Sequence, residues 1–302
     1  MPKTLIILLG PTGVGKTDLS IEIAAYYHTE IVSCDSRQIF REMVIGTAVP
    51  ASASLDAVPH HFIGSHSIHE NYSARKFEVE ALEQLEELFR EREIVVMTGG
   101  SMLYIDAVCK GLDDLPDIDP QLRQLLMNRL ELEGLGPLQV ELQRLDPTYF
   151  REVDLQNPKR ILHALEICLT TGRTYSELRT NQPRERPFNI LKIGLNCERE
   201  RLYERINQRV DLMFSEGLEQ EAAQLHPFNR LNALNTVGYR ELFEYFDGMI
   251  TLEQAKEKIK ANSRKYARKQ LTWFRGDPEV TWFTPDMKEE IIEFINFKIG
   301  NS

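Results

Sequence analysis

The sequence has few cysteines, no long apolar run and no excess of positive charge. Its 302 residues include four scattered cysteines, Cys34, Cys109, Cys168 and Cys197, and no CxxC pair. Since disulfides form mainly in oxidising compartments, we expect reduced thiols and a cytoplasmic location. No basic segment followed by an apolar core opens the chain, and no apolar run approaches the length of a membrane span. We therefore expect neither a signal peptide nor contact with a membrane.

The charge balance narrows the possible partners. The formal net charge is −10, which argues against a uniformly basic nucleic-acid-binding protein, although a local basic face remains possible. Apolar residues make up 42% of the chain and charged residues 27%, as in ordinary globular proteins. The length suits one large domain or two smaller ones, and we expect a monomer.

A phosphate-binding loop is the most specific local signal. The apolar run Leu5–Leu9 predicts a buried parallel strand, and the residues from Lys16 to about Tyr27 have a helical pattern. Between them lies Gly-x-x-x-x-Gly-Lys-Thr, whose backbone N–H groups, helix start and lysine attract the phosphates of a di- or triphosphate. The predicted anion-binding residues are Gly10, Pro11, Thr12, Gly13, Val14, Gly15, Lys16 and Thr17. The hydroxyl of Thr17 is the predicted ligand of a Mg²⁺ cofactor.

One expected acid is missing, and another stands nearby. Phosphate-loop ATPases carry an acidic residue at the end of a core strand, but the buried run Ile94–Thr98 ends in threonine. Asp35 follows the second β-rich run, Glu30–Cys34. Because ligands bind at the carboxyl ends of strands in open α/β sheets, Asp35 is expected beside the phosphate loop. It could be catalytic, or it could be only a helix cap or an outer ligand of the metal.

The middle of the chain changes character. From 115 to 187 the pattern is helical, with breaks at Gly134-Leu135-Gly136 and Asp146-Pro147, and Phe188–Asn196 then returns to strand character. We therefore predict an α/β fold: a P-loop NTPase-like parallel sheet with flanking helices and an all-helical insertion domain. The catalytic core would span 1–114 and 188–302, and the insertion 115–187.

A histidine cluster and two clusters of basic residues could be functional sites or ordinary surface features. His60, His61, His66 and His69 lie among loop-forming residues without a supporting acid or cysteine, so a polar surface loop is favoured over a metal site. The segment 256–275 carries eight Lys or Arg against one acid, with aromatic residues between them. Such a helix is often only a solvated face, but phosphate contacts require cations and extruded bases stack on aromatic rings. Arg201, Arg205 and Arg209 form a second basic stripe.

Several segments together resemble the bacterial tRNA dimethylallyltransferase (tRNA isopentenyltransferase) family. The matching stretches are Gly10–Thr17, Ser33–Met43, Ile45–Ala48, Gly99–Tyr104, Arg160–Glu166, Leu202–Asp211, Val237–Glu241 and Ser263–Arg275. They cover nearly the whole chain in order. The resemblance implies that a dimethylallyl group moves from dimethylallyl diphosphate to the exocyclic amine of the adenine just 3′ of the tRNA anticodon, and that diphosphate leaves.

The resemblance also implies roles for residues. Lys16, Thr17 through Mg²⁺, and Arg209, with Arg205 behind it, would neutralise the leaving diphosphate. Asp35 would accept the proton of the adenine amine, and Thr12 would orient the amine or the diphosphate. The catalytic residues are therefore expected to be Asp35, Thr12 and Arg209.

The anticodon stem-loop of tRNA is the expected macromolecular partner. The residues expected to contact it are Asp35, Ser36, Arg37, Gln38, Ser101, Arg123, Lys159, Arg160, Ile161, Leu162, His163, Val237, Gly238, Tyr239 and Arg240. The chain departs from the family pattern at Ser101-Met102, Phe40, Val49 and His163, which affects individual RNA contacts rather than the reaction.

Three other functions compete with this interpretation. A related enzyme could prenylate a free adenine nucleotide, but AMP needs neither a helical insertion nor a basic 256–275 segment. A small-molecule kinase shares the phosphate loop, although the missing acid at Thr98 counts against it. A non-catalytic RNA-binding module would not need Lys16, Thr17 and Asp35 together.

Overall fold

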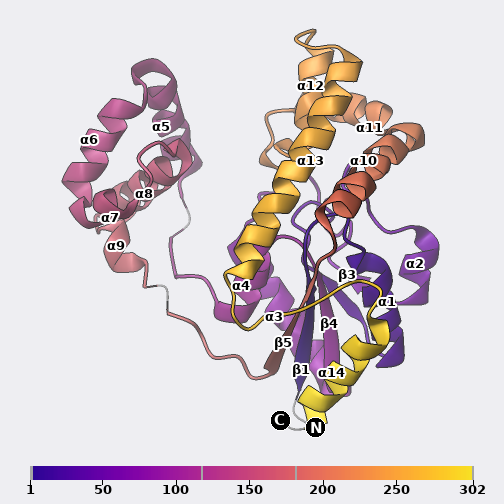
Figure 1. The fold of residues 1–302 in the computed structure, drawn as a ribbon. Helices are drawn as coiled ribbons and strands as arrows, with labels where there is room; N and C mark the ends of the chain where they lie inside the picture. The colour runs from indigo at the N-terminus through magenta and orange to yellow at the C-terminus, as the bar shows by residue number, and fades with distance from the viewer. Residues whose placement is uncertain (1–2, 117, 181, 301–302) are drawn as a thin grey trace. The chain divides into compact units, whose positions relative to one another are not determined.

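The chain forms two compact units. The computed structural model describes residues 3–116, 118–180 and 182–300 (Figure 1). One unit, which we call the core unit, comprises Met1–Cys109 and Glu185–Ser302, and the other, the helical unit, comprises Lys110–Arg184. The sequence placed the insertion at 115–187, whereas the second compact unit begins five residues earlier and ends three residues earlier.

A six-stranded sheet organises the core unit. Its strand order is β3-β2-β4-β1-β5-β6, and each pairing between neighbours is parallel. The strands are β1 (Thr4–Leu9), β2 (Ile31–Ser33), β3 (His60–His61), β4 (Ile94–Gly99), β5 (Asn189–Leu195) and β6 (Thr281–Phe283). Because β5 lies after the helical unit in sequence yet pairs with β1, the insertion interrupts a single sheet.

The central strand shows why an apolar run without alternation forms this structure. Every residue of β1 is buried. Leu5, Ile7 and Leu9 pack into the hydrophobic cluster on one face, and Ile6 and Leu8 pack into the cluster on the other. A strand covered on both faces gains nothing from polar residues on either side. The fold class predicted from the sequence is confirmed.

Helices cover both faces of this sheet (Figure 1). The cluster around Ile6 includes residues of α1 and α14, while the cluster around Leu5 includes residues of α3, α4 and α12. The helices of the core unit are α1 (Lys16–Tyr26), α2 (Ser52–Ala57), α3 (Ala74–Glu91), α4 (Met102–Lys110), α10 (Arg199–Glu216), α11 (Leu218–Leu225), α12 (Tyr239–Phe246), α13 (Leu252–Arg275) and α14 (Lys288–Gly300). In the described part of the chain, no helix is both long and apolar enough to cross a bilayer.

The helical unit has its own hydrophobic cluster, which includes Leu126, Leu142, Ile161 and Leu165. Its helices are α5 (Pro120–Glu133), α6 (Leu135–Leu145), α7 (Pro147–Glu152), α8 (Pro158–Thr171) and α9 (Tyr175–Leu178). Asn157 caps α8 by accepting a hydrogen bond from the backbone N–H of Arg160, and Gly172 ends the helix in the left-handed conformation. The Asn-Pro start and glycine stop of α8 agree with the sequence pattern.

Three local expectations were wrong or incomplete. His60 and His61 form the short edge strand β3 beside β2, rather than a loop, because they extend the sheet by parallel pairing. The basic helix α13 begins at Leu252, four residues before the basic segment 256–275, because Thr251 and Gln254 form a capping box. Helices α2 and α4 were not predicted. No cluster of three or more His, Cys, Asp or Glu suited to a metal ion exists in the described residues.

Candidate active site

The phosphate loop lies between β1 and α1, as its sequence context predicts. Gly15 caps α1 with a φ of 109°, a left-handed conformation that residues with a Cβ rarely adopt. The Nζ of Lys16 donates hydrogen bonds to the carbonyls of Gly10 and Pro11, at 3.0 and 2.9 Å. The lysine therefore folds back over its own loop.

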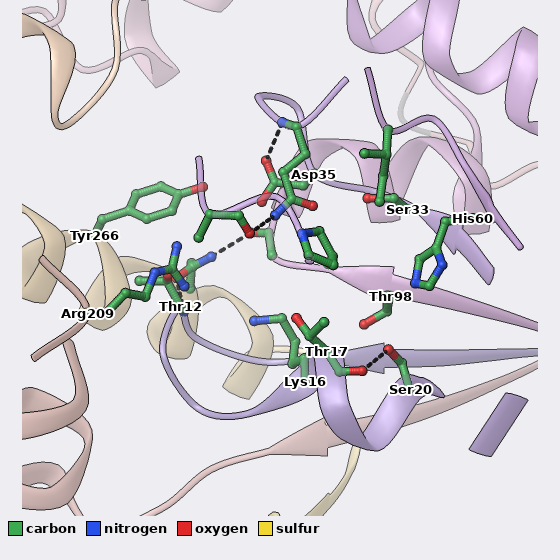
Figure 2. Close-up of a pocket in the computed structure, with 17 residues that line it drawn as sticks. Thr12, Lys16, Thr17, Ser20, Ser33, Asp35, His60, Thr98, Arg209 and Tyr266 are labelled. Carbon is green, nitrogen blue, oxygen red and sulfur yellow. Dashed lines mark hydrogen bonds between the residues drawn. The ribbon is translucent and has the colours of Figure 1, made fainter. Parts of the chain in front are cut away.

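A cavity opens at the carboxyl ends of β1, β2 and β4 (Figure 2). Its open space is about 650 Å³, mouth included. Five residues that the sequence singled out line this one cavity: Thr12, Lys16, Thr17, Asp35 and Arg209. Gln38, from the predicted RNA-binding set, also lines it. The predicted anion-binding and catalytic side chains thus meet at one place.

Two cations, Lys16 and Arg209, line this cavity. Burial and the nearby charge of Arg209 lower the pKa of Lys16 to about 8, although Asp35 acts in the opposite direction. Burial also lowers the pKa of Arg209, and Asp35 again opposes the shift. Positive charge in a confined polar cavity favours an anionic ligand, because such a ligand would remove the cost of burying the cations.

Asp35 divides its hydrogen bonds unequally between its two oxygens. Oδ1 accepts from the backbone N–H of Arg37 at 2.9 Å and of Gln38 at 3.4 Å. Within the described residues, Oδ2 has no hydrogen-bond partner. The turn that follows β2 therefore fixes the carboxylate and leaves one oxygen available in the cavity. The residues after Asp35 form a turn and not a helix, so Asp35 holds a turn instead of acting as the helix cap that the sequence left open.

Gln270 is a site residue that the sequence reasoning missed. It lies on α13 and is 2% exposed. Its Oε1 accepts from the Thr12 backbone N–H at 2.9 Å, and its Nε2 donates to the Gly100 carbonyl at 2.9 Å. One amide thus ties the phosphate loop to the turn after β4. Its place directly after Arg268 and Lys269, in a motif of the resemblance, was the available signal.

Ser101 joins a second set of contacts beside Asp35. Its Oγ accepts from the backbone N–H of Ser36 at 2.8 Å and donates to the Ser36 hydroxyl at 3.0 Å. Burial and the nearby charge of Asp35 raise the pKa of Tyr266 to about 12. Tyr266 lines the cavity (Figure 2), so an aromatic ring from α13 faces the same space as Asp35.

The loop between β2 and α2 is held by a carboxylate. Glu221 on α11 accepts from the backbone N–H groups of Val44, Ile45 and Gly46, at 2.8 to 2.9 Å. It also accepts from the Tyr239 hydroxyl at 2.6 Å. A Cβ at Gly46 would lie 2.6 Å from the Tyr239 ring, so only glycine allows this approach.

The contact of Tyr239 with Glu221 gives part of the segment that was predicted to bind RNA a structural role. Tyr239 is completely buried, and its side chain supports the loop rather than facing a partner. Gly238 donates its backbone N–H to Glu241, which caps α12. Arg240 is exposed and lies 3.6 Å from Glu241. The RNA contact predicted for Val237–Arg240 stays a prediction.

The helical unit gathers other residues of the RNA-binding prediction. Lys159, Arg160 and His163 line an open hollow together with Tyr149 and Tyr175. Ile161 is completely buried, so its side chain stabilises the unit's core. Arg123 makes a two-pronged ion pair with Glu166, at 2.7 and 2.9 Å. Its charge is therefore already engaged inside the unit.

The sequence of the chain is similar to those of known proteins. The model of the IPP transferase family matches residues 38–277. A protein of Phocaeicola vulgatus named tRNA dimethylallyltransferase 1 is 55% identical over 296 residues, which cover 98% of this chain and 99% of that protein. A Christiangramia forsetii protein named tRNA dimethylallyltransferase is 50% identical, and the match covers 99% of this chain and 100% of that protein.

Solved structures resemble the fold as well. The crystal structure of a Bacillus halodurans tRNA isopentenylpyrophosphate transferase has a TM-score of 0.71 and 36% identity, covering 99% of this chain and 96% of that one. A eukaryotic dimethylallyltransferase acting on tRNA has a TM-score of 0.79, covering 99% of this chain and 80% of that one. Its sequence identity is 24%, so this likeness concerns the fold alone.

Proposed function

The chain belongs to the IPP transferase family, and we propose that it is a tRNA dimethylallyltransferase. The enzyme transfers a dimethylallyl group from dimethylallyl diphosphate to the exocyclic amine of the adenine just 3′ of the anticodon. The observation that carries this proposal is one cavity that combines the cations Lys16 and Arg209 with an oxygen of Asp35 that has no hydrogen-bond partner among the described residues.

The cations account for the leaving group. When the bond from the allylic carbon to the diphosphate oxygen breaks, negative charge grows on the diphosphate. Lys16 and Arg209 line the cavity and would stabilise that charge, and a low-dielectric site would strengthen the effect. No phosphoryl group moves and no water is activated, which agrees with Thr98 and Gly99, and not an acid, at the end of β4.

Asp35 accounts for the acceptor. The adenine amine is a weak nucleophile because its lone pair is delocalised into the ring. As its nitrogen bonds to the allylic carbon, its proton passes to Oδ2 of Asp35, which has no other partner among the described residues. The base must leave its stack to reach the cavity. Thr12 lines the same wall and would orient either substrate.

The other wall of the cavity suits the hydrocarbon part of the donor. Ala48, Pro50 and Ile63 line it, together with His60. Burial lowers the pKa of His60, although the contact of its Nδ1 with the Val58 carbonyl at 2.7 Å acts in the opposite direction. A cavity lined by both cations and apolar side chains suits an allylic diphosphate, which has one apolar end and one anionic end.

Mg²⁺ is the proposed cofactor. Thr17 contributes a hydroxyl to the cavity, and no cluster of three ligating side chains occurs in the described ranges. This fits Mg²⁺, which commonly takes few protein ligands and completes its coordination with phosphate oxygens and water. Thr17 would hold the ion, which would neutralise part of the diphosphate charge. We further propose that the enzyme works as a monomer in the cytoplasm.

A parallel acceptor assay tests the function. Labelled dimethylallyl diphosphate is offered to unmodified tRNA, AMP and ATP under identical conditions. We expect label in tRNA alone. Label in AMP without label in tRNA would instead identify an adenylate prenyltransferase. Transfer of phosphate from ATP to a small acceptor would identify a kinase.

A further inference from the structure

The basic helix α13 divides into two halves with different electrostatic surroundings. In its first half, Lys256 and Lys260 pair with Asp211 at 3.1 and 3.0 Å, and Lys258 pairs with Glu244 at 2.7 Å. In its second half, Arg264, Arg268 and Arg275 form no ion pair with a carboxylate of the described residues. The excess of positive charge that the sequence spreads over 256–275 therefore resides in the second half.

The unpaired half borders a pocket on the core unit. We call it the Tyr203 pocket, and it is lined by Arg199, Tyr203, Arg268 and Arg275, with Asn196 and Leu271. Its open space is about 810 Å³, mouth included. Arg199, Arg268 and Arg275 are exposed, and Arg199 also lacks a carboxylate partner within the described part of the chain.

The arginines converge on one phenol. Arg199 and Arg268 donate to the Tyr203 hydroxyl at 3.1 and 2.9 Å. Arg199, Arg264 and Arg268 also lie over the Tyr203 ring, 5.2 to 6.0 Å from its centre. Hydrogen bonding from Arg268 lowers the pKa of Tyr203. The neutral Tyr203 side chain does not compensate the charge of these arginines, so their clustering does not serve the fold. It is notable in a protein whose net charge is −10.

We propose that the Tyr203 pocket and its arginines bind consecutive phosphates of the tRNA backbone, at a site separate from the phosphate loop. The span from Arg264 to Arg275 is about 16 Å of helix, longer than one diphosphate and suited to several backbone phosphates. Guanidinium groups suit phosphate recognition better than ammonium groups, since they bind two oxygens at once.

Helix α13 thereby joins two sites. Its Tyr266 and Gln270 line the catalytic cavity, while Arg268 and Arg275 line the Tyr203 pocket. RNA bound along the second face is thus attached to the helix that also supports the reaction site. This inference rests on the proposed function, because it takes tRNA as the substrate.

The test compares two double variants of one helix. R268Q/R275Q removes two unpaired charges, and K256Q/K258Q removes two paired ones. Binding of an unmodified tRNA is measured at several salt concentrations for the wild type and both variants. We expect R268Q/R275Q to weaken binding roughly tenfold and to reduce the slope of log K against log salt by about 2, because about two phosphate contacts are lost. The slope of K256Q/K258Q should match the wild type.

Other readouts separate this inference from the proposed function. Transfer at saturating tRNA and affinity for a non-reactive allylic diphosphate should be unchanged in R268Q/R275Q. Equal weakening by both double variants, or an unchanged slope in R268Q/R275Q, would overturn the assignment while transfer to tRNA persists. The assignment would also be overturned if the wild type bound inorganic diphosphate at a second site and R268Q/R275Q lost that site. If the double variant fails to fold, R275E gives the same test, since the side chain of Arg275 makes no hydrogen bond to any described residue.

Discussion

Asp35 holds its own loop with one oxygen and leaves the other for chemistry. Oδ1 accepts two backbone hydrogen bonds in the turn after β2, which orients the carboxylate before any substrate arrives. A base that is already oriented needs little rearrangement during the reaction. The residue therefore contributes to local structure and, in the proposed mechanism, to proton transfer.

Replacing Asp35 by asparagine separates these two contributions. Asn keeps an acceptor for the turn but cannot take the proton, so Asp35→Asn should lower kcat by about 10²- to 10⁴-fold. Affinities for tRNA and for the donor should change by less than about threefold. Asp56→Asn, an exposed change on α2, is the matched control. If Asp35→Asn turned over at the wild-type rate, Asp35 would not be the base.

The pKa of Lys16 predicts how the affinity for the donor depends on pH. Its pKa lies at about 8 instead of 10.5, because it is buried beside Arg209. A bound diphosphate favours the charged ammonium, so the pKa rises in the complex. Below pH 8 the lysine is already charged and affinity is flat. Above pH 8 the free protein must take up a proton on binding, so affinity falls by up to about tenfold per pH unit until the complex itself titrates.

Calorimetry with a non-reactive allylic diphosphate, in buffers of different ionisation enthalpy, measures this proton uptake near pH 8.5. Lys16→Met should bind weakly and with no pH dependence from this group. Binding by the wild type without proton uptake at that pH would show that Lys16 does not face the diphosphate.

Among the elements, the loop from Ile39 to Pro50 depends on distant parts of the chain. Gln38 donates to the carbonyls of Thr47 and Ala48, and Glu221 accepts from three successive backbone N–H groups. The loop has little regular structure of its own, so these side chains satisfy its backbone groups. They also place Ala48 and Pro50 at the cavity wall.

Glu221→Gln should loosen this loop. The amide cannot accept as many hydrogen bonds as the carboxylate, so the free energy of unfolding should fall by about 1–3 kcal/mol. Because the loop lines the cavity, KM for the donor should rise more than kcat falls. Glu216→Gln, at the exposed end of α10, controls for the loss of charge. Thermal unfolding and steady-state kinetics measure both effects, and identical behaviour of the two variants would refute the role of Glu221.

The elements differ in how far the sequence predicts them. Strands β1 and β4 follow from apolar runs, and α8 follows from its cap and its glycine stop. The function of Gln270 does not, because its two partners lie 170 or more residues away in sequence. The burial of Tyr239 was equally hidden, since it depends on Gly46 and Glu221. Local patterns encode local structure, whereas these contacts arise only when the sheet brings distant segments together.

At the scale of the whole molecule, the chain combines a catalytic core unit with a helical unit that has a separate hydrophobic cluster. The parallel sheet and the convergence of the phosphate loop with Asp35 followed from the order of strands and motifs. The division of charge on α13 did not, since sequence counts cations without revealing which ones are paired. Net charge alone would have argued against an RNA substrate.

Both units should contribute to RNA binding. K159Q/R160Q in the helical unit removes two cations that line its hollow, and neither forms an ion pair with a described carboxylate. We expect weaker tRNA binding, a slope against log salt lower by about 2, and unchanged affinity for the donor. Combined with R268Q/R275Q, the losses in binding free energy should add, because separate sites act independently. Arg123→Gln, which breaks an ion pair instead, should chiefly reduce the stability of the helical unit.

The most direct test of the central claim is the chemical identity of the product. The wild-type protein is incubated with dimethylallyl diphosphate and either a tRNA with adenine just 3′ of its anticodon or the same tRNA with guanine there. Digestion to nucleosides and mass spectrometry then locate the added group. We predict an adenosine carrying one dimethylallyl group on its exocyclic nitrogen, from the first tRNA only. No modified adenosine, or equal modification of both tRNAs, would contradict the account.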